Sequence, residues 1–163
     1  MTKQALSEIL IDLHNLISNQ RSVVLASISE KNTPLASYAP FIWEDDKFYI
    51  FVSTLSSHTK NIQSGSVSIM FIEDEEKTSQ IYARTRAIFH CHTNLVTEEE
   101  KKSSILNKMT EVHGEIISTL RSLSDFCLIM LTPGSGRFIQ GFGKAYEIGE
   151  NLKSIKPVDP AIN

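Results

Sequence analysis

The chain has 163 residues, of which 41% are hydrophobic and 21% charged, and its net charge is −3 at pH 7. This length and composition are typical of one folded domain with a hydrophobic core, and they exclude an intrinsically disordered chain. The slightly acidic balance argues against nucleic acid as the main partner, and the longest apolar runs are too short to span a bilayer.

The N-terminal residues predict an amphipathic helix, because apolar residues recur at helical spacing from Lys3 to about Ser18. This stretch lacks a basic region followed by an apolar core and a small-residue cleavage site. We therefore expect no secretory signal, no membrane partner and a cytoplasmic location. We expect residues 1–19 to pack as a helix on a domain formed by residues 20–150.

Most of the remaining chain predicts antiparallel strands separated by tight polar turns. The expected strands are Ser22–Ser29, Pro34–Trp43, Lys47–Val52, a long strand Ile81–Asn94, Phe126–Thr132, Arg137–Gln140 and Phe142–Ile148. The run Pro133–Gly136 predicts a turn, and residues 151–163 predict an irregular tail.

Helices are expected at two places between these strands. Phe51–Phe71 has the pattern of a strand, a short helix and a second strand. A longer helical region begins after an N-cap at Thr97, and His113-Gly114 divides it in two. Because strands and helices do not alternate strictly, the pattern favours a small closed barrel over a doubly wound parallel sheet.

The start of the short helix is the first candidate site. Ser56 and Thr59 supply hydroxyl groups there, and His58 and Lys60 lie in the first turns. A helix N-terminus carries unpaired N–H groups and a partial positive charge. The segment therefore predicts a site for a phosphate or a carboxylate.

Two pairs of residues on the expected long strand form further candidates. Arg84 and Arg86 are two residues apart, as are His90 and His92, so each pair shares a face of the strand. The arginines are expected either to hold an anionic ligand or to form ion pairs at a surface or interface. The histidines could bind a metal, but no third ligand is evident, so a solvent-facing or interface pair is favoured and no metal site is assigned.

The order of sequence fragments resembles a known family. SYAPF, SIMFIED and GFGKAY, within residues 20–148, are similar to the haem-utilisation branch of the pyridoxamine-phosphate-oxidase-like split barrels. This resemblance implies a mainly β fold with peripheral helices. The expected architecture is a six-stranded antiparallel split β-barrel of the FMN-binding type, made as a homodimer with its ligand at the dimer interface.

The resemblance also implies a ligand. Flavin-binding members resemble the pattern Ser-Arg-Lys-x-x-Asn-Leu at the helix start, whereas this chain has Ser57 and His58 at the Arg and Lys positions. Loss of these two cations removes charge that would balance a flavin phosphate. Haem is therefore the expected cofactor and FMN the alternative. The expected cofactor-binding residues are Ser56, His58, Thr59, Lys60, Arg84 and Arg86.

The iron ligand is where the sequence departs from the family. Haem-binding members use a His near the C-terminus, whereas the residues after Tyr146 include no His, Cys, Met or Tyr. His58 is the candidate replacement, although a local hydrogen-bonding role at the helix start is favoured for it. A haem-handling protein, binding or degrading haem, is the preferred function. A flavin-dependent oxidoreductase and a cofactor-free small-ligand binder stay open, and no catalytic residue is assigned.

Overall fold

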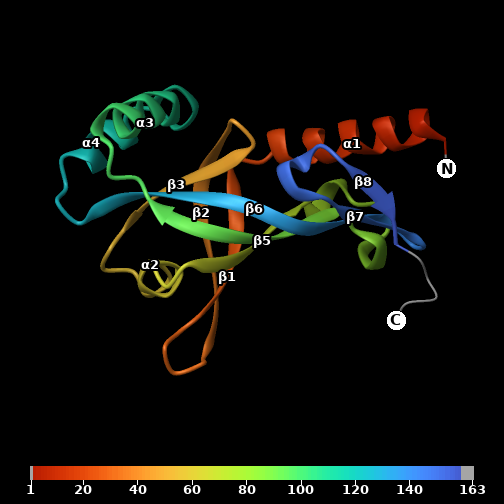
Figure 1. Cartoon of the computed structure of the whole chain (residues 1–163), viewed down its shortest axis with the longest axis horizontal. Helices are drawn as coiled ribbons and strands as arrows, with labels where there is room; N and C mark the ends of the chain where they lie inside the picture. The colour runs from red at the N-terminus through yellow and green to blue at the C-terminus, as the bar shows by residue number, and fades with distance from the viewer. Residues whose placement is uncertain (1, 159–163) are drawn as a thin grey trace.

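The computed structural model describes residues 2–158, which form an eight-stranded antiparallel sheet in the order β3-β2-β1-β4-β5-β6-β7-β8. An additional pairing between β3 and β6 closes the first six strands into a barrel (Figure 1). The strands are β1 (Ser22–Ile28), β2 (Pro34–Glu44), β3 (Lys47–Ser53), β4 (Ser66–Ile72), β5 (Arg86–Leu95), β6 (Phe126–Gly141), β7 (Lys144–Ile148) and β8 (Ile155–Pro157). The six-stranded antiparallel barrel expected from the sequence is confirmed.

Apolar side chains fill the barrel interior. Phe41, Phe48, Phe71 and Phe89 are buried, and their ring centroids lie 5.0–6.2 Å from one another in the contacting pairs. Edge-on and tilted contacts of this kind stabilise an aromatic core beyond the burial of area. The barrel is a packed core, so we expect any ligand of cofactor size to bind outside it.

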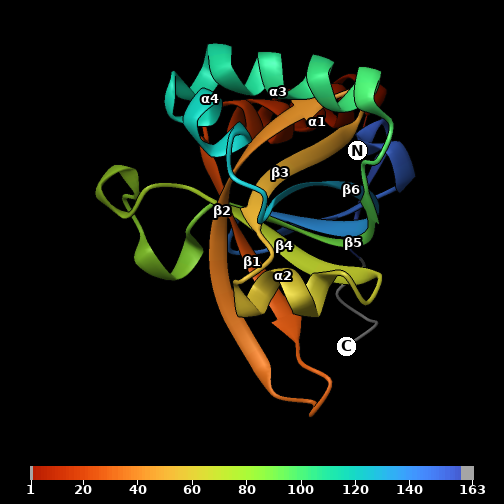
Figure 2. The same cartoon turned by 90° about the vertical axis from the view of Figure 1, so that its left-hand side faces the viewer.

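Helices cover the barrel at several places. They are α1 (Lys3–Ser18), α2 (Ser57–Ile62), α3 (Glu99–His113) and α4 (Ile116–Arg121). In α1 the buried positions are Ile9, Leu13 and Ile17, which follow the expected apolar stripe. Figure 2 shows α3 and α4 together over one side of the barrel, above β3, and α2 lying at the opposite end. None of the helices within residues 2–158 combines the length and apolar content needed to cross a membrane.

Three elements begin at other residues than predicted. The strand expected over Phe142–Ile148 begins at Lys144, because Phe142 and Gly143 form the turn after β6. The strand expected from Ile81 begins at Arg86, because Ile81–Ala83 forms a 3-10 turn, η2. The helix expected to be capped by Thr97 begins at Glu99 with Glu98 at the N-cap. The expected break between α3 and α4 is confirmed at Gly114, whose φ of 86° favours glycine.

The predicted turn at Pro133–Gly136 is wrong. β6 runs through it without a break from Phe126 to Gly141. A Cβ at Gly136 would lie 2.5 Å from Cδ1 of Phe89, so the glycine permits close approach of β5 and β6 instead of a reversal of the chain. The register between these strands shifts between Phe89 and Cys91, which marks a bulge at the same level.

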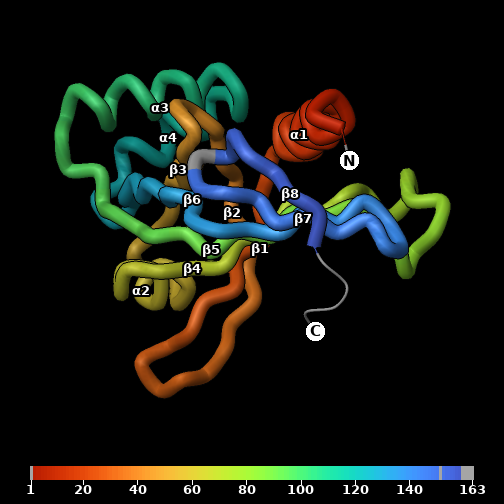
Figure 3. Tube along the Cα trace, turned by 45° about the vertical axis from the view of Figure 1, so that its right-hand side comes forward, coloured from red at the N-terminus to blue at the C-terminus, as the bar shows by residue number. Residues whose placement is uncertain are grey.

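The segment after residue 150 is also more regular than expected. Glu150–Leu152 forms a 3-10 turn, η3, and β8 pairs with β7. Leu152 and Ile155 are buried, so apolar packing orders a stretch that has no strand-like alternation. Residues 159–163 of the expected irregular tail lie outside the described residues. Figure 3 shows β7 and β8 together beside α1.

Candidate functional site

The α2 segment is attached to one end of the barrel. The Asn61 side chain donates a hydrogen bond to Oγ of Ser27 at 3.1 Å, and the hydroxyl of Thr93 bonds to the carbonyl of Ile62. Ile62 itself is fully buried. Ser56 occupies the N-cap position without a side-chain capping bond. The helix has only six residues, so fewer peptide dipoles add at its N-terminus than in a long helix.

The candidate residues of α2 face different surroundings. Thr59 is fully buried, and Lys60 is exposed to solvent. His58 is half-buried, and burial lowers the pKa of its imidazole. Within residues 2–158, neither Nε2 of His58 nor Oγ1 of Thr59 has a hydrogen-bond partner. Two of the four α2 candidates therefore place polar atoms inside the protein, where they pack against the barrel.

A projecting segment joins β4 to β5 (Figure 2). Arg84 lies in this segment, and Arg86 is the first residue of β5. The Arg84 side chain donates from Nε to the carbonyl oxygen of Glu73 at 2.6 Å, and its guanidinium lies 3.6 Å from the Glu75 carboxylate. Arg86 donates to the carbonyl oxygen of Arg84 at 2.9 Å. Arg84 precedes β5, so the two arginines do not alternate along a single strand as expected. The hydrogen bonds that both arginines donate to carbonyl oxygens stabilise the backbone of this segment.

The two groups of candidates lie at opposite ends of the β4–β5 hairpin. Ser66, just after α2, pairs with His92, whereas Ile72 pairs with Arg86 at the far end. Six residues separate these ends of the strand, which corresponds to roughly 20 Å at about 3.3 Å per residue. A single copy of the chain therefore does not bring the α2 residues and the two arginines into one site.

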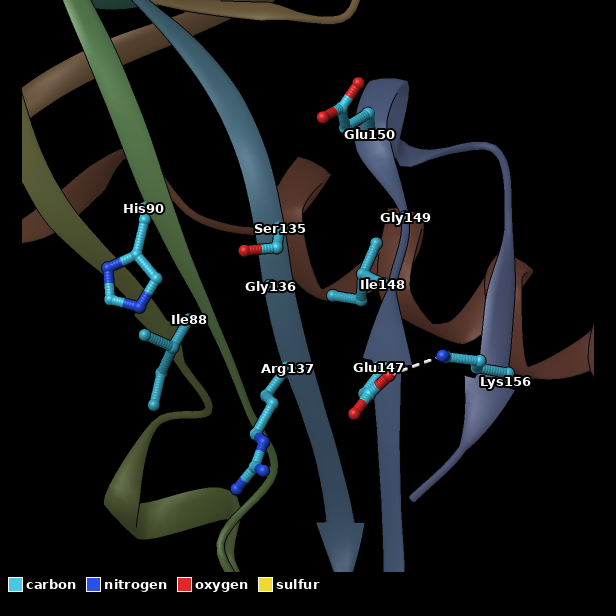
Figure 4. A pocket seen from close by; sticks show the side chains of 10 residues that line it. All are labelled: Ile88, His90, Ser135, Gly136, Arg137, Glu147, Ile148, Gly149, Glu150 and Lys156. Atoms are coloured by element: carbon cyan, nitrogen blue, oxygen red, sulfur yellow. Dashed lines mark ion pairs between the residues drawn. The ribbon is translucent and has the colours of Figure 1, made fainter. Parts of the chain in front are cut away.

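A groove of about 680 Å³ lies between these two groups, on the outer face of β5, β6 and β7 (Figure 4). It is lined by Ile88, His90, Ser135, Gly136, Arg137, Glu147, Ile148, Gly149, Glu150 and Lys156. Its size is within the range of about 300–1,000 Å³ that is typical of small-molecule sites. Among the candidates named from the sequence, His90 lines the groove, and none of the six expected cofactor-binding residues does.

Charged and polar groups of the groove are arranged by strand pairing. Ile88 pairs with Arg137, and Arg137 pairs with Glu147 on β7. Glu147 forms an ion pair of 2.8 Å with Lys156, and this lysine lowers the pKa of the Glu147 carboxyl. Arg137 makes no ion pair with any residue of the described part of the chain. No pattern in the sequence indicates this site, because its residues come together only through the registers of β5, β6 and β7.

The histidines differ in how their ring nitrogens are used. Nε2 of His14 lies 3.1 Å from the Leu152 carbonyl, and Nε2 of His113 lies 2.9 Å from the Phe41 carbonyl. His90 and His92 are exposed on β5, as the sequence predicted. Nδ1 of His90 lies 2.8 Å from the hydroxyl of Ser68, which is its partner on β4. Among the described residues no group of three or more His, Cys, Asp or Glu side chains could hold a metal ion.

A six-stranded barrel of this topology, closed by β3 and β6 and extended by β7 and β8, defines a split-barrel protein. Residues 11–140 match the sequence profile of the family described as pyridoxamine 5'-phosphate oxidase. The chain belongs to this family, which confirms the resemblance seen in the sequence.

Individual relatives agree with this assignment. The chain is 35% identical over 136 residues to a Vibrio cholerae protein named heme oxygenase HutZ, covering 82% of this chain and 77% of that protein. A crystal structure of HutZ, described there as a heme storage protein, superposes with a TM-score of 0.71 at 31% identity, over 76% of this chain and 88% of that one. Campylobacter jejuni ChuZ superposes with a TM-score of 0.86 at 30% identity, over 96% of this chain. The chain spans only 65% of the ChuZ chain.

Proposed function

We propose that this protein binds haem in a cleft that a second copy of the chain completes. The 35% identity to a protein named heme oxygenase, over most of both chains, is the observation that carries this proposal. The same relative is described both as an oxygenase and as a storage protein, so the proposal is stated as haem binding, with degradation as its enzymatic form. Bound haem would supply the redox chemistry, and the chain would supply binding and orientation.

The outer face of the barrel supports association with a second copy. Strand pairing places Tyr38, Val24, Met70 and Ile88 in one row across β2, β1, β4 and β5. Tyr38 is 68% exposed, and Ile28, on the same outer face of β1, is 61% exposed. Exposed apolar side chains gathered on one face are typical of protein–protein contact surfaces. We propose that this face forms the homodimer interface.

A dimer would also resolve the separation of the expected cofactor-binding residues. Of the α2 residues, Ser56 is partly exposed and Lys60 is exposed, whereas Thr59 and Nε2 of His58 are buried. Ser56 and Lys60, at one end of the β4–β5 hairpin, can serve the same ligand as Arg84 and Arg86 only if the second copy brings its own end alongside. In this proposal the arginines meet haem carboxylates, which favour guanidinium partners. The contacts of Arg84 with Glu73 and Glu75 make Arg86 the better placed of the two.

Absorption spectra of the purified protein, titrated separately with haemin and with FMN, test the ligand. The proposal predicts a Soret band that saturates at one haemin per chain or per dimer, and no saturable change with FMN. Saturable FMN binding without haemin binding would support the flavin alternative. No saturable change with either compound would contradict both and leave a cofactor-free binder.

Light scattering of the protein with and without the substitution Tyr38→Glu tests the proposed interface. A carboxylate placed at the centre of an apolar contact costs several kcal/mol when it is buried. We expect a dimeric wild type and a monomeric variant, whereas Lys31→Glu in the β1–β2 turn leaves the mass unchanged. A monomeric wild type would contradict the proposed interface.

A further inference from the structure

We propose that the segment between β4 and β5, residues 73–85, docks on a second copy of the chain and places Tyr82 in a hollow between β1 and α2 of that copy. We call this segment the arm. The contact rests on the proposed homodimer and is a separate part of it. Three features support it: the exposed apolar side chains of the arm, the lining of the hollow, and the charges of both regions.

The arm is held in shape by its own contacts. The backbone N–H of Glu73 donates to the Thr85 carbonyl at 2.9 Å, which closes the base of the arm. The Thr78 hydroxyl donates to the Glu73 carboxylate at 2.9 Å, and Lys77 forms an ion pair of 2.8 Å with Asp74. A segment that is ordered before association loses less conformational entropy when it binds. The arm is therefore suited to dock as a preformed element.

The arm also presents apolar surface that its own copy does not cover. Ile81 is 52% exposed and Tyr82 is 82% exposed, both on the 3-10 turn η2. Figure 2 shows the arm extending away from the barrel. Tyrosine combines an apolar ring with a polar hydroxyl, which makes it frequent in protein–protein contacts. Two neighbouring apolar side chains on a projecting arm indicate a contact surface.

The hollow suits a tyrosine side chain. It has a volume of about 620 Å³ and lies between the end of β1 and α2. Ile28, which is 61% exposed, is the apolar side chain in a lining that is otherwise polar. Glu30 and Gln63 also line the hollow, and their side-chain oxygens can accept a hydrogen bond from a phenol hydroxyl. This mixed lining matches the ring and the hydroxyl of Tyr82 better than it matches an apolar ligand.

The hollow is continuous with the proposed interface, because Ile28 belongs to both. It lies at the α2 end of the β4–β5 hairpin, roughly 20 Å from the arm end at about 3.3 Å per residue, so an arm does not reach the hollow of its own copy. When the axis of a two-fold dimer crosses β4 and β5 within the interface, the arm of each copy lies over the α2 end of the other. Such docking carries Arg86, the first residue of β5, toward Lys60 of the second copy.

The charges of the two regions are complementary. The arm begins with the four consecutive acidic residues Glu73–Glu76 and contains two basic residues, Lys77 and Arg84. Lys60 lines the hollow, is exposed, and makes no ion pair with a residue in the range 2–158. Complementary charges favour one orientation of two partners and disfavour others. An acidic arm is therefore favoured over the α2 end of a second copy, whereas two arms side by side would place like charges together.

Engineered cysteines test the contact directly. The double variant Ile28→Cys/Tyr82→Cys is treated with a short bifunctional maleimide, and the mass of the denatured product is measured. We expect cross-linked dimers from this variant, and none from either single variant or from Ile28→Cys/Ile116→Cys, which places the second thiol on α4. The wild type, treated in parallel, gives the background from its own thiols. Burial raises the pKa of the Cys91 thiol to about 12 and makes it unreactive, and Cys127 is half-buried.

Light scattering over a range of protein concentrations gives a second measure without new thiols. We expect Tyr82→Ala to raise the dissociation constant of the dimer at least about tenfold, because the loss of an aromatic contact is made twice in a two-fold dimer. Tyr82→Phe keeps the ring and should stay closer to the wild type. Ile116→Ala, on exposed α4, is the control and should leave the dissociation constant unchanged.

The outcomes separate this contact from the proposed function. A monomeric wild type would overturn both the proposed dimer and the docking of the arm. A dimeric wild type with no cross-link in Ile28→Cys/Tyr82→Cys, or with an unchanged dissociation constant in Tyr82→Ala, would overturn the docking alone. Cross-linking of Tyr82→Cys by itself would also overturn it, because the two arms would then meet each other. Neither measurement uses haemin, so both are independent of the proposed ligand, and circular dichroism confirms that the variants are folded.

Discussion

The α2 end of the barrel and the groove on β5, β6 and β7 contain similar polar residues in opposite surroundings. At the α2 end, Thr59 and Nε2 of His58 are turned into the protein and lack partners among the described residues. In the groove, His90 is exposed and its ring is fixed by Ser68. The first arrangement costs free energy because buried polar atoms lack partners, whereas the second leaves the imidazole in contact with solvent. A serine- and histidine-rich motif is therefore weaker grounds for a site than accessibility and a fixed side chain.

Removal of the apolar anchor of α2 should give the largest loss of stability. Ile62 is fully buried, so Ile62→Ala is expected to lower the free energy of unfolding by about 2–5 kcal/mol, through lost burial and the cavity left behind. Urea denaturation measures this. The control Lys60→Ala, on the exposed side of the same helix, should stay within about 0.5 kcal/mol. Equal effects of the two substitutions would contradict the view that α2 serves as a packed cover of the barrel.

Thr59→Val distinguishes an internal packing role from an anion site at the α2 start. The substitution replaces a hydroxyl that lacks a described partner by a methyl group of similar volume. Because an unsatisfied buried hydroxyl costs about 1–3 kcal/mol, we expect stability to rise by about 1 kcal/mol. Thermal and urea unfolding measure the change. A loss of stability would indicate that the hydroxyl is used, by a water or a ligand, and would favour the site expected from the sequence.

The pH dependence of stability tests the burial of His58. Burial lowers the pKa of its imidazole from the ordinary value of 6.5, so the folded state binds this proton less readily than the unfolded state. The stability that this group supplies is complete above the unfolded pKa, and it is lost as the pH falls through the folded pKa. We expect His58→Gln to flatten the decline of unfolding free energy below pH ~6.5, the unperturbed histidine pKa. An identical pH profile in wild type and variant would show that His58 titrates as if it were in water.

Local patterns predicted the barrel better than they predicted its site. Strand centres such as Val23–Leu25 and Phe48–Val52 consist of apolar β-branched and aromatic residues, which predict strands, and the family resemblance supplied the barrel closure. Pro133–Gly136 was misread because the close approach of Gly136 to Phe89 depends on a distant strand. The start of β5 was misplaced because the Arg84 contact with the Glu73 carbonyl joins residues eleven apart. Neither contact can be predicted from the composition or from the alternation of apolar and polar residues.

The groove was missed for the same reason. Ile88 and His90 are far in sequence from Arg137 and Ile148, and only the pairing of β5 with β6 and of β6 with β7 places them on one surface. The sequence did indicate that His90 and His92 share an exposed face, which the structure confirms. It could not indicate which of them borders a cavity, because that depends on the registers of β5 with β6 and of β6 with β7.

The most direct measurement is a side-by-side haemin titration of the wild type and Tyr38→Glu, followed by Soret absorption and light scattering of the same samples. We predict that the dimeric wild type binds haemin to saturation, and that the monomeric variant binds haemin much more weakly because its cleft is incomplete. A wild type that binds no haemin, or a monomeric variant that binds it as tightly as the wild type, would contradict a haem cleft completed by a second copy.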